Sequence, residues 1–417
     1  MIFRRIRSSK LVQVYFGFIT IWAVNVSVIF RSSWAGDDWP ISQTPYWIQW
    51  RYGALTNWNI WTEALFWNDQ WMKGAGRFYP LTWIESRFVF SYLRELWQYK
   101  LYQVAMLFFA GILLIVVCYL FTRSHLFTVM VLLSLSLTIQ FRRDFDPHLA
   151  FAVMLPSLLI KIFLALIALY YASKTKKLMV GVFLGIISGI LYFAAMSTYE
   201  FSFLLFPLFV IAYLFGISID TVRHERKSFY LSWLVSLRFL PVIISWLSYG
   251  YYVFGYLRPR ASAISGSYVL GISWSSIEVF ISQAFMGLPL ISLRNMDLSF
   301  SAFSLTIGFV LIYICRMSFK SLLRDKNGLE SFINKEDSQN WQHKRNTILL
   351  LFFAFSMILS PGFMMALQPT WWNRADIQHT YLGVMITEFG TAILIATLLE
   401  ILVKKQLRFR NTAKKKL

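Results

Sequence analysis

Residues 101–121 read LYQVAMLFFAGILLIVVCYLF and contain no acidic or basic side chain. An α-helix rises about 1.5 Å per residue, so a stretch of this length can cross the roughly 30 Å of hydrocarbon in a bilayer. In hydrocarbon the backbone polar groups must be satisfied within the segment itself, which favours a helix. This stretch therefore predicts a transmembrane helix.

Similar apolar stretches recur outward from it in both directions. The chain is 57% apolar and only 14% charged, which excludes a soluble globular protein of 417 residues. We predict an all-α polytopic membrane protein, with residues 1–417 forming a single integral membrane domain. About ten spans are expected from the lengths of the apolar runs, at residues 11–30, 101–121, 126–140, 149–171, 178–196, 201–219, 229–254, 300–319, 347–367 and 382–403.

The positions of the basic residues predict the orientation. The chain has 40 Lys and Arg against 20 Asp and Glu, a net charge of +20. Placing the N-terminus inside gives the inner segments 24 basic residues and the longer outer segments 13. Because cytoplasmic loops are enriched in Lys and Arg, we expect both termini in the cytoplasm, with 404–417 as a basic cytoplasmic tail near membrane lipid. This charge distribution indicates membrane topology and no nucleic-acid partner.

Two large outer loops follow from this topology, at residues 31–100 and 258–299. The first is crowded with tryptophan, and its residues 41–73 and 80–97 have apolar positions near helical spacing. We expect amphipathic helices here, lying in the outer membrane interface. The aromatic side chains fit two interpretations, an aromatic belt at the interface or a cleft in which a sugar ring packs on flat aromatic faces.

Asp37 and Asp38 form the strongest chemical signal in the first outer loop. They come directly after the first expected span, between Gly36 and Trp39-Pro40. One interpretation is structural, since an Asp at this position can cap an interfacial helix. The other is catalytic, with one carboxylate acting as a general base or cation ligand and the other supporting it, and with Trp39 beside the substrate.

Several outward arginines are candidate ligands for a phosphate group, because fixed cations stabilise negative charge on a leaving oxygen. Their alternative role is to extend toward the polar interface from apolar surroundings. These residues are Arg77, Arg142, Arg143, Arg258, Arg260 and Arg374.

Three further outer residues are candidates for substrate binding. Asp144 lies in the dense polar turn 140–148, which either holds a phosphate or caps two helices. Glu200 is an isolated acid at the membrane edge, either a second functional carboxylate or half of a buried pair with a basic neighbour. Trp371 adds an aromatic face in the compact outer loop 368–381.

Charged residues inside the expected spans require partners, because an unpaired charge at the bilayer centre is costly. We expect Lys161 to pair with Glu388 or Glu200, or to meet a lipid phosphate. Glycines at 181, 185 and 189 recur every fourth residue and predict close packing of their helix against another.

The five histidines show no zinc-ligand spacing, so we expect no metal site and no cofactor; a divalent metal has no support in the sequence. The chain also lacks a phosphate-binding loop of the Gly-x-x-x-x-Gly-Lys type. ATP-driven transport by this chain is therefore not expected.

The N-terminal quarter resembles membrane glycosyltransferases of the GT-C fold. The resemblance is carried by a basic start, Asp-Asp-Trp at 37–39 directly after the first span, an aromatic outer loop with interfacial helices, and Gly-Arg-Phe-Tyr-Pro at 76–80 before the second span. In size and layout the chain is similar to bacterial serotype-converting O-antigen glucosyltransferases. In that resemblance, Asp37 or Asp38 matches the catalytic acid of the first loop, and Arg77 belongs to the Gly-Arg-Phe element.

The resemblance implies a function. The donor would be a sugar, such as glucose, on polyprenyl phosphate, and the acceptor a lipid-linked extracytoplasmic glycan such as the O-antigen of lipopolysaccharide. The reaction would take place at the periplasmic face of the bacterial inner membrane. The alternative is a flippase or transporter of a lipid-linked sugar or glycan, which would share the basic and aromatic residues but has little use for an outward carboxylate pair.

Overall fold

The computed structural model describes residues 15–17, 19–20, 22–24, 26–34, 38–139, 148, 154–217, 237–261, 271–286, 340–369 and 383–416. Side chains are described for these residues except 28, 31, 286, 340–343 and 403–416. Within these ranges all regular structure is helical, so the all-α class is confirmed.

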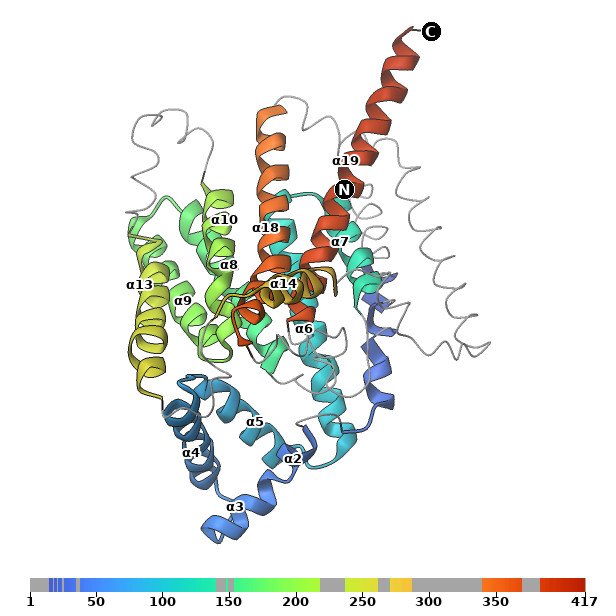
Figure 1. Cartoon of the computed structure of the whole chain (residues 1–417). Coiled ribbons are helices and arrows are strands. Elements are labelled where there is room, and N and C mark those ends of the chain that lie inside the picture. Colours follow the sequence, from blue (N-terminus) through green and yellow to red (C-terminus); the bar gives the residue numbers. More distant parts are fainter. Residues whose placement is uncertain are drawn as a thin grey trace.

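Helices of the described segments fall into a bundle and a separate layer at one of its ends (Figure 1). The layer consists of α2 (Asp38–Ser42), α3 (Thr44–Tyr52), α4 (Asn57–Ala75) and α5 (Pro80–Tyr92). The bundle contains α6 (Leu96–Thr122), α7 (His125–Thr138), α8 (Met154–Lys174), α9 (Leu178–Met196), α10 (Phe206–Gly216), α13 (Leu240–Gly250), α18 (Asn340–Ala366) and α19 (Val384–Lys416). Short elements complete the list: η1 (Ser27–Arg31), η2 (Glu200–Leu205), the π-helix η3 (Tyr251–Leu257), η4 (Arg258–Arg260) and α14 (Trp274–Met286), which packs against α18 and α19.

Among the described residues, five helices are long and apolar enough to cross a membrane: Leu96–Thr122, Met154–Lys174, Leu178–Met196, Lys344–Ala366 and Val384–Leu402. Shorter apolar helices cover 15–24, 125–138 and 200–216. The expected span at 229–254 is described only from residue 237, and its helix α13 begins at Leu240. The span at 300–319 lies outside the described residues. The chain is thus an all-α membrane protein, while the count of ten spans is not confirmed.

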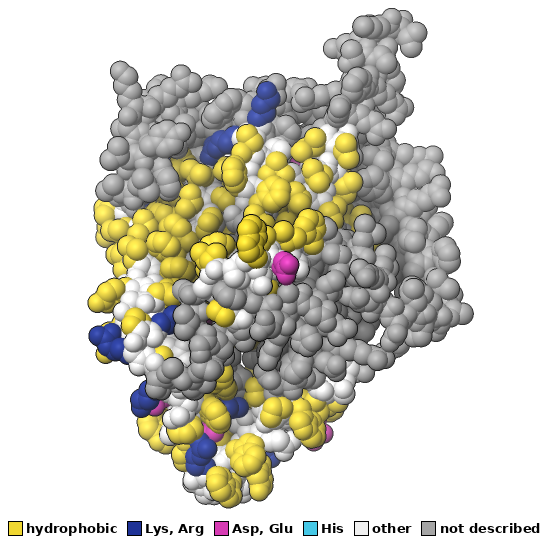
Figure 2. Space-filling model, viewed as in Figure 1, with side chains coloured by type: hydrophobic (Ala, Val, Ile, Leu, Met, Phe, Trp, Pro, Cys, Tyr) yellow, Lys and Arg dark blue, Asp and Glu magenta, His cyan; other side chains and the backbone are white. Residues whose placement is uncertain are grey.

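The surface of the bundle agrees with a membrane environment. Figure 2 shows hydrophobic side chains spread across its visible face, with Lys and Arg side chains toward the two ends. Large apolar residues of the bundle helices are well exposed, among them Phe183, Ile190, Leu247 and Phe352. Lipid takes the place of water around such a surface.

The glycine repeat in α9 forms a close contact, as its spacing predicts. A Cβ atom on Gly185 would lie 2.1 Å from the carbonyl oxygen of Arg238, and one on Gly189 would lie 2.8 Å from that of Pro241. Gly181 similarly faces the Arg238 side chain. The three glycines therefore let the backbone of α13 and the turn before it approach α9 directly.

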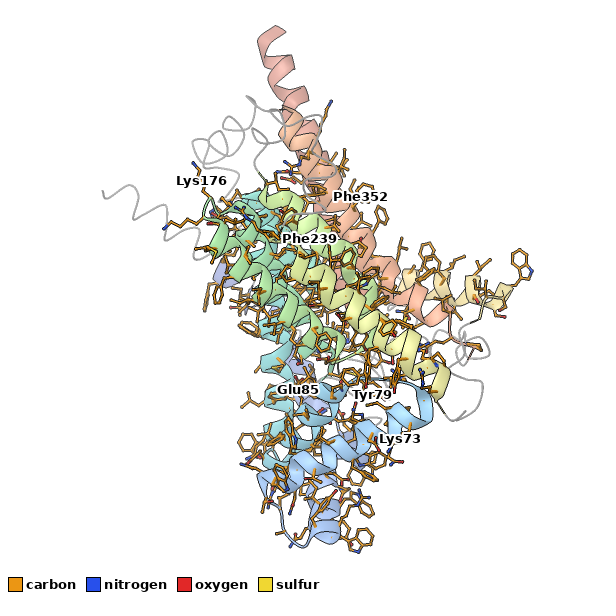
Figure 3. The ribbon with its side chains drawn as sticks, turned by 90° about the vertical axis from the view of Figure 1, so that its left-hand side faces the viewer. Lys73, Tyr79, Glu85, Lys176, Phe239 and Phe352 are labelled. Atoms are coloured by element: carbon orange, nitrogen blue, oxygen red, sulfur yellow. The ribbon has the colours of Figure 1, made fainter. Side chains whose placement is uncertain are left out.

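The segments expected on the outer side lie together at one end of the bundle. The Leu81 N–H donates to the Ser197 carbonyl, and Gly76 lies against the backbone of Arg258. Lys176, in a turn expected on the inner side, lies at the opposite end from Lys73, Tyr79 and Glu85 (Figure 3). The separation of the two sets of loops agrees with the charge pattern, whereas the direction in which each end faces stays a prediction.

Candidate functional site

Helix α5 organises the polar residues at the end of the bundle. Pro80 occupies its first turn, where the missing N–H of proline costs nothing. Between Pro80 and Phe90 the helix rises about 15 Å. Three polar clusters lie along this length: one around Glu200 just before its start, one around Glu85 in its middle, and one around Asp38 near its end.

Glu200 and two arginines form the first cluster. The Arg77 Nε donates to Glu200 Oε1 at 2.5 Å, and the Arg258 Nη2 donates to Glu200 Oε2 at 2.9 Å. The Glu200 side chain is 1% exposed and each arginine side chain 11%. The interpretation of Glu200 as part of a buried pair with a basic neighbour is therefore correct, and the number of basic neighbours is two.

Aromatic rings surround the Arg77 guanidinium. Its central carbon lies 4.7 Å from the ring centre of Tyr79, 5.3 Å from that of Tyr199 and 5.8 Å from that of Trp71. Cation–π contacts of this kind hold the guanidinium in place while Glu200 neutralises it. Arg77 is thus brought to the predicted site region, but it is engaged by the protein itself.

Gly76 explains how Arg258 reaches this cluster. Gly76 ends α4 with φ +63°, a left-handed conformation that suits glycine. A Cβ atom at this position would lie 2.7 Å from the Arg258 Cα. The missing side chain of Gly76 therefore allows the 76–80 segment to lie directly on the Arg258 backbone.

The electrostatics of the first cluster favour its ion pairs. Burial alone would raise the pKa of the Glu200 carboxyl, but the charges of Arg77 and Arg258 outweigh burial and lower it. Burial would lower the pKa of Arg77, yet the Glu200 charge holds that pKa well above its ordinary value. One carboxylate and two guanidinium groups leave the cluster with an excess of positive charge. The Arg258 Nε and Nη1 have no hydrogen-bond partner within the described chain.

Glu85, Ser157 and Lys161 form the second cluster, which joins α5 to α8. The Lys161 Nζ lies 2.5 Å from Glu85 Oε1, and the Ser157 hydroxyl donates to Glu85 Oε2 at 2.6 Å. The expected pairing of Lys161 with Glu388 or Glu200 is therefore wrong. Glu85 is the partner because α5 packs beneath the first turns of α8, a contact that sequence spacing does not indicate.

Asp38 lies at the start of α2 and is 4% exposed. The Tyr99 hydroxyl donates to Asp38 Oδ2 at 2.6 Å, and the Gln103 Nε2 lies 3.4 Å from the same oxygen. Both donors belong to the first turns of α6, one helical turn apart on the same face. The structure thus places Asp38 in a buried polar position held from a membrane-spanning helix.

A small aromatic core supports this third cluster. The Tyr99 ring stacks on Trp34 with centres 5.2 Å apart and contacts Phe90 of α5 at 4.6 Å. Ile41 and Val89 pack around the same rings. Because Tyr99 is fixed by these contacts, its hydroxyl holds the Asp38 carboxylate in one orientation.

Lys100 follows Tyr99 and was not predicted as a site residue. It is 1% exposed, and its Nζ has no hydrogen-bond partner among the described residues. The ammonium lies 5.6 Å from the Tyr99 ring centre and interacts electrostatically with Asp38. Sequence reasoning counted Lys100 only as one of the outer basic residues. The sequence feature that could have identified Lys100 is its position, one turn into an otherwise apolar helix.

The outer helices hold one another through a separate network. Glu63 of α4 accepts hydrogen bonds from Arg51 at 2.8 Å and from the Trp67 indole at 2.8 Å. Arg87 of α5 donates to the Thr44 hydroxyl at 2.8 Å and lies over the Trp67 ring. Burial lowers the pKa of Arg87 to about 10. These residues fix the layer that lies over the three clusters.

The tryptophans of the first outer loop divide into two groups. Trp67 and Trp71 of α4 each stack on Trp83 of α5, with ring centres 5.8 and 6.4 Å apart, and so join the two helices. Another group has large exposed fractions: Trp39, Trp47, Trp50, Trp58 and Trp97. The loop is therefore helical as expected, and only some of its aromatic faces are open to a ligand or lipid.

The remaining predicted site residues have different outcomes. Trp39 is exposed. Arg260 points away from Glu200, donating to the Tyr256 carbonyl at 3.0 Å with its guanidinium 4.1 Å from the Tyr256 ring centre. The structure therefore separates the roles of Arg258 and Arg260. Other predicted residues lie outside the described residues: Asp37, Arg142, Arg143, Asp144, Trp371 and Arg374.

A fully buried contact between a histidine and a glutamate inside the bundle was also not predicted. The His148 Nε2 lies 2.9 Å from Glu388 Oε2, and both side chains are 0% exposed. In the sequence, Glu388 was considered only as a partner for Lys161, and His148 lies in the polar turn 140–148. No pattern in the sequence joined them.

Within the described part of the chain, no group of three or more His, Cys, Asp or Glu side chains could hold a metal ion. What the described clusters offer is a fixed carboxylate at Asp38 and two sets of cations, one at each end of α5. Comparison with known protein families, with curated proteins and with solved structures finds no match for this chain.

Proposed function

We propose that this protein is a GT-C-type membrane glycosyltransferase. It transfers a sugar, glucose by the resemblance, from a polyprenyl-phosphate donor to an extracytoplasmic glycan acceptor such as O-antigen. Asp38, or its neighbour Asp37, acts as the general base. The observation that carries the proposal is the Asp38 carboxylate, buried and oriented by Tyr99 and Gln103 at the end of the bundle.

The proposed reaction uses the carboxylate as a proton acceptor. The acceptor hydroxyl gives its proton to Asp38 or Asp37 while its oxygen bonds to the anomeric carbon of the sugar. The bond between that carbon and the phosphate oxygen breaks, and the polyprenyl phosphate leaves with the electron pair. A nearby cation stabilises the negative charge that develops on the leaving oxygen.

Three further features support the proposal. The exposed tryptophans of α2–α4 offer flat faces for sugar rings. Buried cations occur at both ends of α5, at Lys100 and at Arg258. The clusters lie at the end of the bundle opposite Lys176, which fits a site on the periplasmic side of a bacterial inner membrane with both termini in the cytoplasm.

The test is sugar transfer in membranes with a defined polyprenyl-phosphate sugar and a defined glycan acceptor. Asp38→Asn and Asp37→Asn each keep the side-chain shape while removing the proton acceptor. We expect one of them to accumulate normally and to lose transfer. Near-normal transfer by both variants would remove the catalytic assignment and favour transport of a lipid-linked sugar.

A further inference from the structure

We infer that Lys100 binds the phosphate group of the lipid substrate beside Asp38. The inference rests on the proposed function, because it names the part of the substrate that this residue meets. It also differs from the sequence-based expectation, which placed the phosphate on outer arginines.

The surroundings of Lys100 point to a missing anion. A buried cation is costly unless an anion or hydrogen-bond acceptors compensate it. The Lys100 Nζ is buried and has no acceptor among the described residues, although an ammonium carries three donors. A phosphate oxygen would supply the acceptors that the protein does not.

Arg87 is the instructive contrast. It is almost as buried as Lys100, at 6% against 1% exposed, yet it has a hydrogen bond to Thr44 and lies over the Trp67 and Trp83 rings. Lys100 has the Tyr99 ring and the charge of Asp38 nearby, but its ammonium makes no hydrogen bond within the described chain. The environment of Arg87 accounts for its burial within the fold, whereas that of Lys100 does not.

The depth of Lys100 in the bundle suits a lipid phosphate. Helix α6 has 27 residues, so it is about 40 Å long and exceeds the roughly 30 Å of hydrocarbon in a bilayer. Lys100 is the fifth residue of this helix, and the α6 end that contains it lies next to the layer of α2–α5 (Figure 1). A residue one turn from such an end lies near the level of lipid headgroups, where the phosphate of a polyprenyl lipid would also lie.

Its position relative to Asp38 favours Lys100 over Arg258 as the ligand of the phosphate. Lys100 lies between Tyr99 and Gln103, the two residues that hydrogen-bond Asp38. Arg258 lies at the other end of α5, and about 15 Å of helix separates the two places. A phosphate on Lys100 keeps the attached sugar within reach of Asp38, and it does not require the substrate to extend along α5.

The experiment measures binding without transfer. Purified full-length protein in detergent is titrated with farnesyl monophosphate, a short prenyl phosphate without a sugar, and with farnesol as the uncharged probe. We expect farnesyl monophosphate to bind and farnesol to bind at least about tenfold more weakly. Lys100→Met should weaken binding of the phosphate by at least about tenfold, and Lys100→Arg should restore part of it.

Two variants serve as comparisons. Lys73→Met makes the same substitution at a side chain that is 73% exposed and paired with Asp69, and it should bind like the unmodified protein. Arg258→Met removes the competing cation, and it should retain binding. Loss of binding in Arg258→Met together with normal binding in Lys100→Met would overturn the inference, as would absence of binding by the unmodified protein.

Thermal unfolding without ligand separates a ligand-binding role from a structural one. If Lys100 lacks a protein partner, Lys100→Met removes an uncompensated buried charge and should raise the unfolding temperature. A lower unfolding temperature together with unchanged binding would mean that Lys100 is structural.

Titration with inorganic phosphate and with phosphatidylglycerol identifies the source of the anion, and equal binding of either one would overturn the assignment to a prenyl phosphate. Prenyl phosphate binding without sugar transfer would leave this inference intact and reject the proposed function.

Discussion

Glu200 and Asp38 are both buried carboxylates at the end of the bundle, yet their surroundings differ. Glu200 accepts charged hydrogen bonds from Arg77 and Arg258, so its negative charge is more than compensated. Asp38 accepts from the neutral groups of Tyr99 and Gln103, and the nearby Lys100 makes no hydrogen bond to it. Two charged hydrogen bonds from arginines suit a structural carboxylate, whereas the hydroxyl of Tyr99 and the amide of Gln103 orient a carboxylate without neutralising its charge.

The contrast also separates two roles of the first outer loop. The segment 76–80 joins α4 and α5 to the bundle through Arg77 and Glu200. The segment that begins at Asp38 joins the same layer to α6, next to the Lys100 ammonium, which has no hydrogen-bond partner among the described residues. We therefore expect substitutions at the Glu200 end to change mainly stability, and substitutions at the Asp38 end to change mainly activity.

The largest expected effect is on transfer by Asp38→Asn. General-base catalysis contributes about 10²- to 10⁴-fold to a rate, so transfer should fall by that factor if Asp38 is the base. The amide still accepts the Tyr99 hydrogen bond, so accumulation in the membrane should be nearly normal. The measurement is initial transfer rate per molecule of protein, with Asp69→Asn, at an exposed ion pair, as the control.

Glu200→Gln should reduce mainly the stability of the protein, in contrast to Asp38→Asn. It leaves Arg77 and Arg258 buried with no carboxylate between them, and breaking a buried pair costs about 3–5 kcal/mol. We expect a large loss of unfolding free energy in detergent. A variant that accumulates and unfolds normally but transfers no sugar would contradict this division of roles and make Glu200 the functional carboxylate.

Gly76→Ala tests how closely the 76–80 segment must approach Arg258. The left-handed conformation costs a non-glycine residue about 1–2 kcal/mol, and the clash with the Arg258 backbone should add about 1–3 kcal/mol. Gly53→Ala is the matched control, because Gly53 has φ +77° and nothing within 4 Å of an added Cβ. Equal losses of unfolding free energy in the two variants would show that the contact with Arg258 contributes nothing.

The smallest expected effect is the loss of unfolding free energy at acidic pH. The pKa of Glu200 is lower in the folded protein than its ordinary value of 4.5, so its contribution to stability is fully present above pH 4.5. That contribution should decline as the pH falls below 4.5 and through the folded-state pKa. We expect the unmodified protein to lose more unfolding free energy over this range than Glu200→Gln does. Identical acid profiles would indicate that the arginines do not lower the pKa of Glu200.

Much of the fold could be predicted from local features. The apolar run at 101–121 predicted the core of α6, and the glycine repeat at 181–189 predicted a close helix contact. Helices in the first outer loop followed from the spacing of its apolar residues. These features depend on hydropathy and on the 3.6-residue period of a helix, both of which are read from neighbouring residues.

The candidate site was predicted only in part. Asp38, Arg77, Glu200 and Arg258 were selected from the sequence as candidate residues, and the structure places all four in polar contacts at one end of the bundle. Which of them meet could not be predicted. Arg77 and Glu200 are 123 residues apart and Glu200 and Arg258 are 58 apart, so no local period connects them.

The sequence alone determined the class of the protein, an all-α membrane protein, and the residues whose charges require partners. Tertiary structure decided which partners they have: Glu85 for Lys161, two arginines for Glu200, and no described hydrogen-bond partner for Lys100. The physical reason is that insertion and helix formation depend on the composition of each segment, whereas ion pairs depend on which helices pack together. A contact such as Gly76 against Arg258 exists only once distant segments are already in place.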